Sequence, residues 1–206
     1  MATRPGHGRK ECTVTSLRFT VQFHSWFRVG AAYGRDGVDA AIDWHDPLPA
    51  DHLKGVMRDS ARLLLGPEHP LIATVFGTPK TPSPWSWSKA SPDGDSRWTA
   101  TTRHRVAIDE VTHTARKDHL VLGEQAWIDR ASFEVRRIPP IEGDDAPAPL
   151  RPIEDDQVRL LRASARGIHH LGAWRRRGLG WVGVSDDEPW DDSDIQWLLT
   201  TRAVIS

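Results

Sequence analysis

The sequence has a single cysteine, no long hydrophobic run and almost no net charge. Cys12 alone cannot form an intramolecular disulfide or a cysteine zinc cluster, and one thiol is typical of a protein in a reducing compartment. No segment approaches the roughly 20 apolar residues of a membrane-spanning helix, and the first ten residues are basic without the apolar core of a secretion signal. We therefore expect a cytoplasmic protein without a membrane partner.

The 206 residues suit one domain with one core, and a composition of 38% hydrophobic and 27% charged residues is that of a globular chain. The net charge of -1 hides an uneven distribution along the chain. The segment Val158–Ser185 has six arginines and no acid, whereas Asp186–Asp194 has six acids and no base. The basic segment could meet phosphates and the acidic one a basic neighbour, unless both are solvated surfaces.

Hydrophobic periodicity predicts a mixed α+β chain. Apolar and polar residues alternate near the N-terminus, as in a half-buried strand, and two later segments have apolar residues at helical spacing. The elements expected from these patterns are a strand over 17–23, a helix over about 51–66, a second helix from 155 or 156 to about 172, and a strand over 179–184.

Two proline-rich segments interrupt this pattern. Residues 78–96 and 138–152 hold nine of the fifteen prolines, and we expect both to be long irregular connections because proline donates no backbone hydrogen bond. Between them, the strand-like segments 103–109 and 124–138 flank the polar segment 110–123. This arrangement predicts a projecting hairpin.

A glycine- and arginine-rich loop joins the second helix to the last strand, with the sequence Gly172-Ala-Trp-Arg-Arg-Arg-Gly-Leu-Gly180. Its glycines allow close approach of the backbone to a ligand, and its arginines and amides suit a polyanion. A tight turn with solvated arginines is the alternative. On the first helix, Lys54, Arg58 and Arg62 share one face, a spacing suited either to successive phosphates or to surface solubility.

Five groups of residues occur in an order that is typical of one family. They are Phe27–Gly30, then Ala41–Asp43 with Leu48–Arg58, then Val75–Gly77, then Arg105–Asp109 with Thr112 and Thr114, and finally His170–Val182. Together they resemble the RAMP superfamily of CRISPR-associated proteins. In that family a first strand ends in a glycine-bearing turn, a loop leads into a helix with a Phe-Gly signature after it, a strand enters a thumb hairpin, and a glycine-rich loop precedes the last strand.

The resemblance implies a ferredoxin-like fold, similar to the RNA-recognition motif, with a thumb hairpin and proline-rich insertions. It implies a single RAMP domain over 1–206. Its expected parts are the first strand, loop and helix (13–77), an insertion (78–102), the thumb region (103–137), a linker with the second helix, glycine-rich loop and last strand (138–185), and an acidic C-terminal extension (186–206).

Among RAMP proteins, the sequence most resembles the repeated RNA-cleaving backbone subunit of type III effector complexes. That resemblance implies an endoribonuclease that binds CRISPR RNA and cuts complementary target RNA at regular intervals. Its expected partners are both RNAs, other copies of the chain and other effector subunits.

The resemblance also implies the site residues. Asp43 occupies the position of a loop aspartate needed for metal-dependent cutting, and is expected to be catalytic and a ligand of Mg2+ or Mn2+. Because RNA carries its own 2'-hydroxyl nucleophile, one carboxylate can suffice when the strand is held in line. The expected RNA-binding residues are Arg28, Lys54, Arg58, Arg175, Arg176, Arg177, Gly178 and Gly180. Thr112, His113 and Thr114 are the expected thumb residues.

Several alternatives stay open at this stage. The chain could be a non-catalytic RAMP scaffold, or a stand-alone endoribonuclease that matures the guide with histidine acid–base chemistry. Asp43 could simply cap a turn. Trp85 and Trp87 could stack on bases, although packing of the insertion or of a subunit interface is the stronger interpretation.

Overall fold

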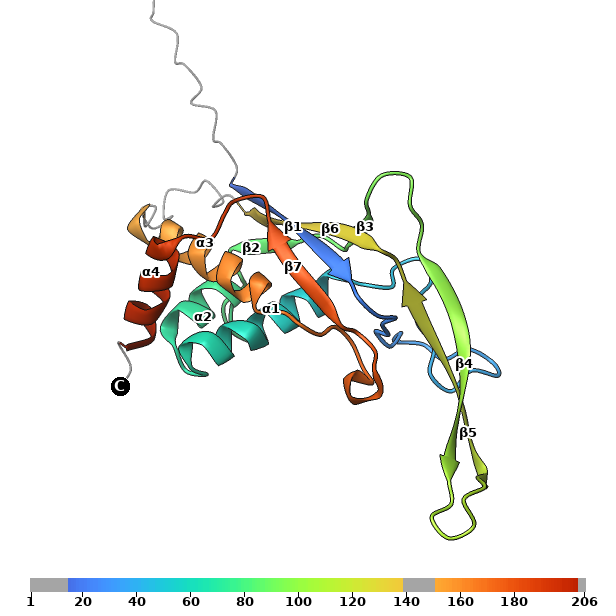
Figure 1. Cartoon of the computed structure of the whole chain (residues 1–206). Helices are drawn as coiled ribbons and strands as arrows, with labels where there is room; N and C mark the ends of the chain where they lie inside the picture. The colour runs from blue at the N-terminus through green and yellow to red at the C-terminus, as the bar shows by residue number, and fades with distance from the viewer. Residues whose placement is uncertain (1–14, 139–150, 204–206) are drawn as a thin grey trace, which may run out of the picture.

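A computed structural model of the chain describes residues 15–138 and 151–203 (Figure 1). An antiparallel sheet forms its centre and has the strand order β2-β6-β1-β7, with β3 also pairing with β6. The strands are β1 (Ser16–Phe23), β2 (Trp85–Trp87), β3 (Ser91–Pro92), β6 (Arg130–Arg137) and β7 (Val182–Asp186). The expected first strand is therefore confirmed, and the last strand begins at 182 rather than 179.

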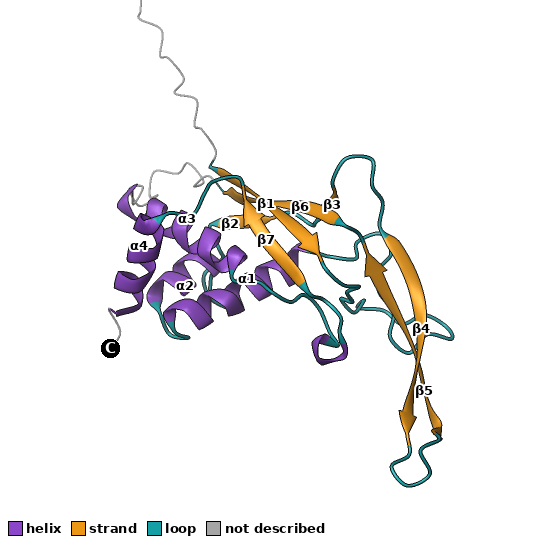
Figure 2. Cartoon of the chain, viewed as in Figure 1, coloured by secondary structure: helices purple, strands orange, loops and turns teal. Residues whose placement is uncertain are grey.

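The sheet buries one of its faces against helices. Figure 2 shows the helices gathered on one side of the sheet; they are α1 (Ala50–Leu65), α2 (Pro70–Phe76), α3 (Arg151–Arg166) and α4 (Asp192–Ala203). Phe19, Val21 and Phe23 alternate along β1 toward that side and are buried. The intervening side chains of β1, beginning with Arg18, lie on the opposite face, which we call the open face.

The order of these elements defines the fold. The succession β1-α1-β2-β6-α3-β7, with β1 and β6 in the centre of the sheet, is the ferredoxin-like arrangement. The α+β fold class is therefore confirmed. The first helix ends where expected, because Gly66 adopts a φ of 99° and its N–H donates to the Arg62 carbonyl.

A long hairpin projects from this body (Figure 1). It consists of β4 (Thr99–Ile108) and β5 (Ala115–Trp127), which form a two-stranded sheet, and its base is joined to the body by isolated bridges from Ala126 to Phe27 and from Gly123 to Ala40. The projecting hairpin is thus confirmed, but its polar segment is mostly strand, and only residues 109–114 form the turn. The strand-like segment 124–138 is divided between two strands, because the chain leaves the hairpin at Trp127 and pairs with β1 from Arg130 onward.

The first proline-rich segment is more ordered than expected. Residues 78–96 contain β2 and β3, so a wholly irregular connection is wrong. Both strands are too short to show a period in the sequence, and prolines are tolerated because both strands hydrogen-bond only to β6. Of the second proline-rich segment, residues 139–150 lie outside the described part of the chain.

Two helical features differ from the expectation. The helix α3 begins at Arg151, before the expected 155 or 156. The sequence does not predict α4, since an acidic segment of this kind is typical of a polar extension. Asp191 caps this helix, since its Oδ1 accepts the N–H groups of Ser193 (2.8 Å) and Asp194 (3.1 Å). None of the described helices is both long and apolar enough to span a membrane.

Candidate nucleic-acid interface

Three of the six arginines in the basic segment Val158–Ser185 pair with acidic side chains of the same chain. The Arg162 side chain is only 8% exposed and contacts Asp186 (2.5 Å) and Asp194 (3.7 Å). Arg166 also pairs with Asp186, and Arg159 lies 4.0 Å from Asp194. The acidic stretch, which begins at the end of β7, therefore has a basic neighbour within the same chain. Arg159, Arg162 and Arg166 of α3 thereby hold the C-terminal segment on that helix.

The other three arginines form an exposed turn. Arg175, Arg176 and Arg177 make a single 3-10 turn, η1, and all three are exposed. Within residues 15–138 and 151–203, no salt bridge involves any of them. The turn therefore concentrates positive charge that can contact a polyanion. We call it the arginine turn.

Backbone hydrogen bonds fix the loop that carries this turn. The Gly172 N–H donates to His52 Nε2 (3.0 Å), and the Ala173 N–H donates to the Arg28 carbonyl (2.7 Å). On the other side, the Gly180 N–H donates to the Trp26 carbonyl (2.7 Å). The arginine turn is thus presented by a rigid loop joined to α1 and to the segment after β1.

Glycine is required at both ends of this loop for close packing. Gly172 and Gly180 have φ angles of 74° and 79°. A Cβ on Gly172 would overlap the Arg28 carbonyl, and one on Gly180 would overlap the Leu171 carbonyl. The amide of Gly180 is already used inside the protein, whereas Gly178, next to the arginines, is exposed.

Burial also changes the acid–base behaviour of His52 beneath the loop. Burial, assisted by the nearby charge of Arg175, lowers the pKa of His52 below its usual value. The neutral imidazole is the form that can accept the Gly172 N–H at Nε2. The loop is therefore held by a histidine that stays neutral.

Trp174 connects the arginine turn to the hairpin. Two guanidinium groups lie over its ring, with Arg28 Cζ at 4.8 Å and Arg105 Cζ at 4.3 Å from the ring centroid. The ring rests on Gly123 of β5, where a Cβ would overlap it. Trp174 itself has a φ of 60°, an uncommon angle for a side chain of this size. We call Trp174, Arg28, Arg105 and Gly123 the tryptophan clamp.

A buried carboxylate anchors the loop before α1 to the same hairpin. Glu124 of β5 is 1% exposed, and it pairs with Arg35 (2.6 Å) and accepts the Ile42 N–H (3.1 Å). Asp39 accepts the Leu122 N–H (2.8 Å). The loop that carries Asp43 is thereby attached to the hairpin base. Glu124 and Trp174 are absent from the sequence-based candidates, because their roles depend on contacts between distant segments.

Asp43 does cap a turn. Its Oδ1 accepts the N–H groups of His45 (2.9 Å) and Asp46 (3.3 Å). The His45 N–H is the main cause of a lowered pKa for Asp43, with further contributions from the Asp46 N–H, the His45 charge and a hydrogen bond from Tyr33. Asp43 is therefore ionised at neutral pH. The capping role and a role in catalysis are compatible, because a carboxylate has a second oxygen.

Asp46 adds a second carboxylate beside it. Burial raises the pKa of Asp46, Lys89 opposes this shift, and the charge of Asp43 adds to it. Its Oδ1 is buried without a hydrogen-bond partner. In the described part of the chain, no group of three or more His, Cys, Asp or Glu side chains is arranged to hold a metal ion. Asp43 and Asp46 are the two carboxylates of this loop that could serve as ligands, and any divalent ion bound to them would need RNA phosphate or water to complete its coordination.

The basic face of α1, formed by Lys54, Arg58 and Arg62, lies apart from the arginine turn. Lys54 Nζ lies 5.2 Å from the Trp87 ring centroid, so this face of α1 points toward β2. Arg58 is one turn further along the same face, whereas His52, under the arginine turn, is about 200° away from Lys54 around the helix. The expected RNA-binding residues therefore form two separate groups.

The expected thumb residues lie at the tip of the hairpin. Asp109 Oδ1 accepts the N–H groups of Val111 (3.1 Å) and Thr112 (2.9 Å), and the Thr112 and Thr114 hydroxyls lie 2.9 Å apart. His113 has a φ of 52° within this turn. The tip is therefore a defined and exposed turn.

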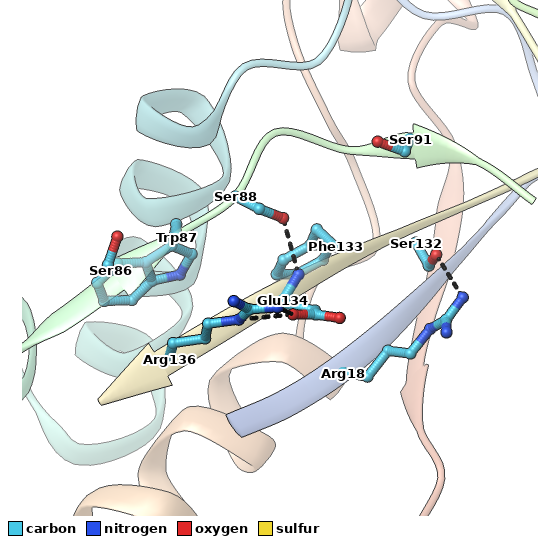
Figure 3. Close-up of a pocket in the computed structure, with 9 residues that line it drawn as sticks. All are labelled: Arg18, Ser86, Trp87, Ser88, Ser91, Ser132, Phe133, Glu134 and Arg136. Carbon is cyan, nitrogen blue, oxygen red and sulfur yellow. Dashed lines mark hydrogen bonds and ion pairs between the residues drawn. The ribbon is translucent and has the colours of Figure 1, made fainter. Parts of the chain in front are cut away.

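Trp85 and Trp87 pack the insertion, in agreement with the stronger interpretation. Both are buried, Trp85 donates its indole N–H to Gln157 (2.8 Å), and Trp87 stacks on Phe76. Neither ring face is open to a base. A depression of about 530 Å³ is lined by Trp87 together with residues of β1, β3 and β6 (Figure 3). Its arginines are already satisfied, because Arg18 donates to Ser132 and Arg136 to Glu134.

These observations define a ferredoxin-like protein with a projecting hairpin and an arginine-rich loop clamped to the hairpin base. The chain belongs to the RAMP superfamily, whose sequence model matches residues 43–183. A search of curated protein sequences found no match.

A solved structure supports the same fold. The chain is similar to one chain of a cryo-EM structure of the type III-B Cmr-beta complex bound to cognate target RNA, with a TM-score of 0.54 and 14% sequence identity. The similarity covers 83% of this protein and 58% of that chain, so this protein spans well under two thirds of its relative.

Proposed function

We propose that this protein is a backbone subunit of a type III CRISPR ribonucleoprotein, which binds CRISPR RNA and cleaves complementary target RNA at regular intervals. The observation that carries the proposal is the tryptophan clamp. It holds the arginine turn against the base of the hairpin, so that a strand bound at the turn runs beside the hairpin.

The chemistry of the arginine turn suits RNA phosphates without regard to sequence. Guanidinium groups form charge-assisted hydrogen bonds to phosphate oxygens, and three adjacent ones can follow consecutive phosphates. A guide-binding subunit needs this property, because the guide sequence varies while its backbone does not. The partners that follow are CRISPR RNA, target RNA, further copies of the chain and other effector subunits, in keeping with the cognate target RNA bound to the Cmr-beta complex that contains the similar chain.

Cleavage is assigned to Asp43. In the proposed reaction the target 2'-oxygen attacks the adjacent phosphorus, the bond from phosphorus to the 5'-oxygen breaks, and the leaving oxygen takes up a proton. In this proposal the ionised Asp43, supported by the capped turn, accepts the proton of the 2'-hydroxyl, either directly or through water on a Mg2+ or Mn2+ ion that Asp43 and Asp46 would hold. When bound, such an ion would neutralise charge that develops on the phosphate.

RNA binding is tested with the variant Arg175→Ala/Arg176→Ala/Arg177→Ala. We expect the affinity for unrelated guide sequences to fall by the same factor for each sequence. The log–log slope of affinity against salt should fall by about 0.7 for each phosphate that the variant no longer neutralises. Binding is measured by fluorescence anisotropy over a range of salt concentrations. Unchanged affinity and slope would contradict the RNA-binding surface.

Cleavage is tested with Asp43→Asn, which keeps an oxygen to cap the turn but removes the negative charge. In the assembled complex, we expect loss of regularly spaced cuts, unchanged assembly and a folded protein. Asp59→Asn, on an exposed position of α1, is the matched control and should cut normally. Cutting by Asp43→Asn at the normal rate would assign catalysis elsewhere.

One observation favours a second candidate, the non-catalytic scaffold. Asp43 Oδ1 already caps a turn, which is a sufficient structural reason for the residue. The scaffold function predicts an intact wild-type complex that binds guide and target RNA but does not cut at positions set by this subunit. In that case Asp43→Asn and Asp59→Asn do not differ in cleavage from each other or from the wild type.

A further inference from the structure

Trp181 exposes its ring directly after the arginine-rich loop. Its side chain is 58% exposed. The next residue, Val182, is buried on the helix side of β7, so Trp181 points to the open face of the sheet. There its ring lies 5.3 Å from the His24 ring, between centroids, at an angle of 55°.

Hydrogen bonds hold this tryptophan in place. Its backbone N–H donates to Ser25 Oγ (2.9 Å), and its carbonyl accepts the His24 N–H (2.9 Å). It is also paired with His170 across an antiparallel bridge. The flanking bonds, Val182 N–H to the His169 carbonyl and Leu171 N–H to the Gly180 carbonyl, make this a close pair. The His170 side chain therefore lies on the same face as Trp181.

The exposed ring differs from the other open tryptophan. Trp44, 46% exposed, is covered on one side by the Arg35 guanidinium, 4.9 Å from the ring centroid. Among the described residues, no cation covers the Trp181 ring. A rigid, open aromatic face of this kind is pre-organised for stacking, because little conformational entropy is lost on binding.

The surroundings of Trp181 favour a nucleobase over an apolar protein surface. The side chains beside the ring are polar, namely those of His24, Ser25 and His170, and the arginine turn is part of the same loop. An apolar partner would have to bury these imidazoles and lie next to three exposed guanidinium groups. A single-stranded RNA offers both a flat ring for the indole and phosphates for the arginines.

We infer that Trp181, flanked by His24 and His170, is a stacking site for one unpaired RNA base adjacent to the phosphates held by the arginine turn. This inference rests on the proposed RNA-binding function. It adds a contact with a base on the open face, at a position separate from the hairpin and from Asp43.

The test compares Trp181→Ala with Trp181→Phe, using a fluorescent single-stranded oligouridylate as the probe. Loss of one stacked base should weaken binding about 5- to 150-fold for Trp181→Ala, whereas Trp181→Phe should retain most of the affinity. The salt slope should stay unchanged, because every phosphate-binding arginine is still present. Leu63→Ala, which removes an exposed apolar side chain of α1 (82% exposed), is the control and should bind as the wild type does.

A probe series with one abasic position at each site in turn makes the test specific. At one position, the abasic RNA should bind wild type and Trp181→Ala equally well, because the stacked base is then missing. Equal binding of the intact RNA by wild type and Trp181→Ala would overturn the stacking site. So would a change confined to self-association of the protein, which would assign Trp181 to a protein interface. If the wild type binds no RNA at all, the proposed function fails first.

Discussion

The two halves of the basic segment have opposite roles. Arg159, Arg162 and Arg166 of α3 face the acidic stretch that begins at the end of β7, and Arg162 is buried between Asp186 and Asp194. The arginines of η1, which follow later in the same segment, are exposed and have no salt bridge among the described residues. Both sets lie in one acid-free run of sequence.

The difference shows how charge is divided between stability and binding. The C-terminal acids pair with Arg159, Arg162 and Arg166 of α3, whereas the arginines of η1 stay unpaired among the described residues and concentrate positive charge near the hairpin base. Net charge near zero is thus compatible with a strongly basic surface. The comparison predicts that variants of the two sets change different properties.

The largest effect is expected from Arg162→Ala. Removing Arg162 takes the buried cation away from Asp186 and Asp194 and leaves them only the more exposed Arg166 and Arg159, so we expect a loss of up to about 3–5 kcal/mol in the free energy of unfolding. Urea unfolding measures this loss. The affinity of the folded protein for RNA should stay unchanged.

Arg177→Ala is the matched substitution in the arginine turn. Its unfolding free energy should change by no more than about 0.5 kcal/mol, because the side chain is exposed, while RNA affinity falls. If Arg162→Ala weakened RNA binding at full stability, or Arg177→Ala unfolded the protein, the division between the two sets would be wrong.

An intermediate effect is expected from Gly123→Ala. The new methyl group would displace the Trp174 ring from the hairpin, at a cost of about 1–3 kcal/mol, and would weaken RNA binding by loosening the clamp. The same change in a Trp174→Ala background should cost little. Double-mutant unfolding curves measure this coupling.

Gly55→Ala is the control for this prediction. It lies in the middle of α1 with open space around it, so alanine should stabilise the helix by about 0.5–1 kcal/mol without changing RNA affinity. Additive costs for Gly123→Ala and Trp174→Ala would show that the two residues do not form a clamp.

The smallest effect concerns pH. Because the pKa of His52 is lowered on folding, the unfolded chain binds its proton more tightly, and stability from this group is present above the unfolded pKa of about 6.5. It is lost as the pH falls below that value, at no more than about 1.4 kcal/mol per pH unit. Compared with wild type, His52→Gln should lose less stability between about pH 7.5 and pH 5.5 in urea unfolding. An identical pH profile would contradict a neutral, buried His52.

Local patterns are enough to predict the elements that build the sheet and the first helix. The alternation of apolar and polar residues along β1, and the apolar stripe of α1 that ends at Gly66, are patterns of residues close together in the sequence. The polar run between two strand-like segments likewise indicates a hairpin. Short edge strands such as β2 carry too few residues for a period. The capping turn at Asp191 is concealed by the acidic composition around it.

The site is only partly accessible to sequence reasoning. The glycines and arginines between Gly172 and Gly180 indicate a binding loop, and the family motifs indicate Asp43. That Trp174 bridges Arg28 and Arg105, or that the α3 arginines are neutralised, depends on tertiary contacts across long sequence separations. No pattern within one segment contains that information.

Photocrosslinking tests the central claim that RNA lies across the arginine turn and the base of the hairpin. A single-stranded RNA carrying 4-thiouridine is crosslinked to the protein, and the attached peptides are identified by mass spectrometry. We expect crosslinks within residues 170–183 and on the hairpin strands around Arg105. Crosslinks confined to α3 and α4, with none in these two segments, would contradict the account.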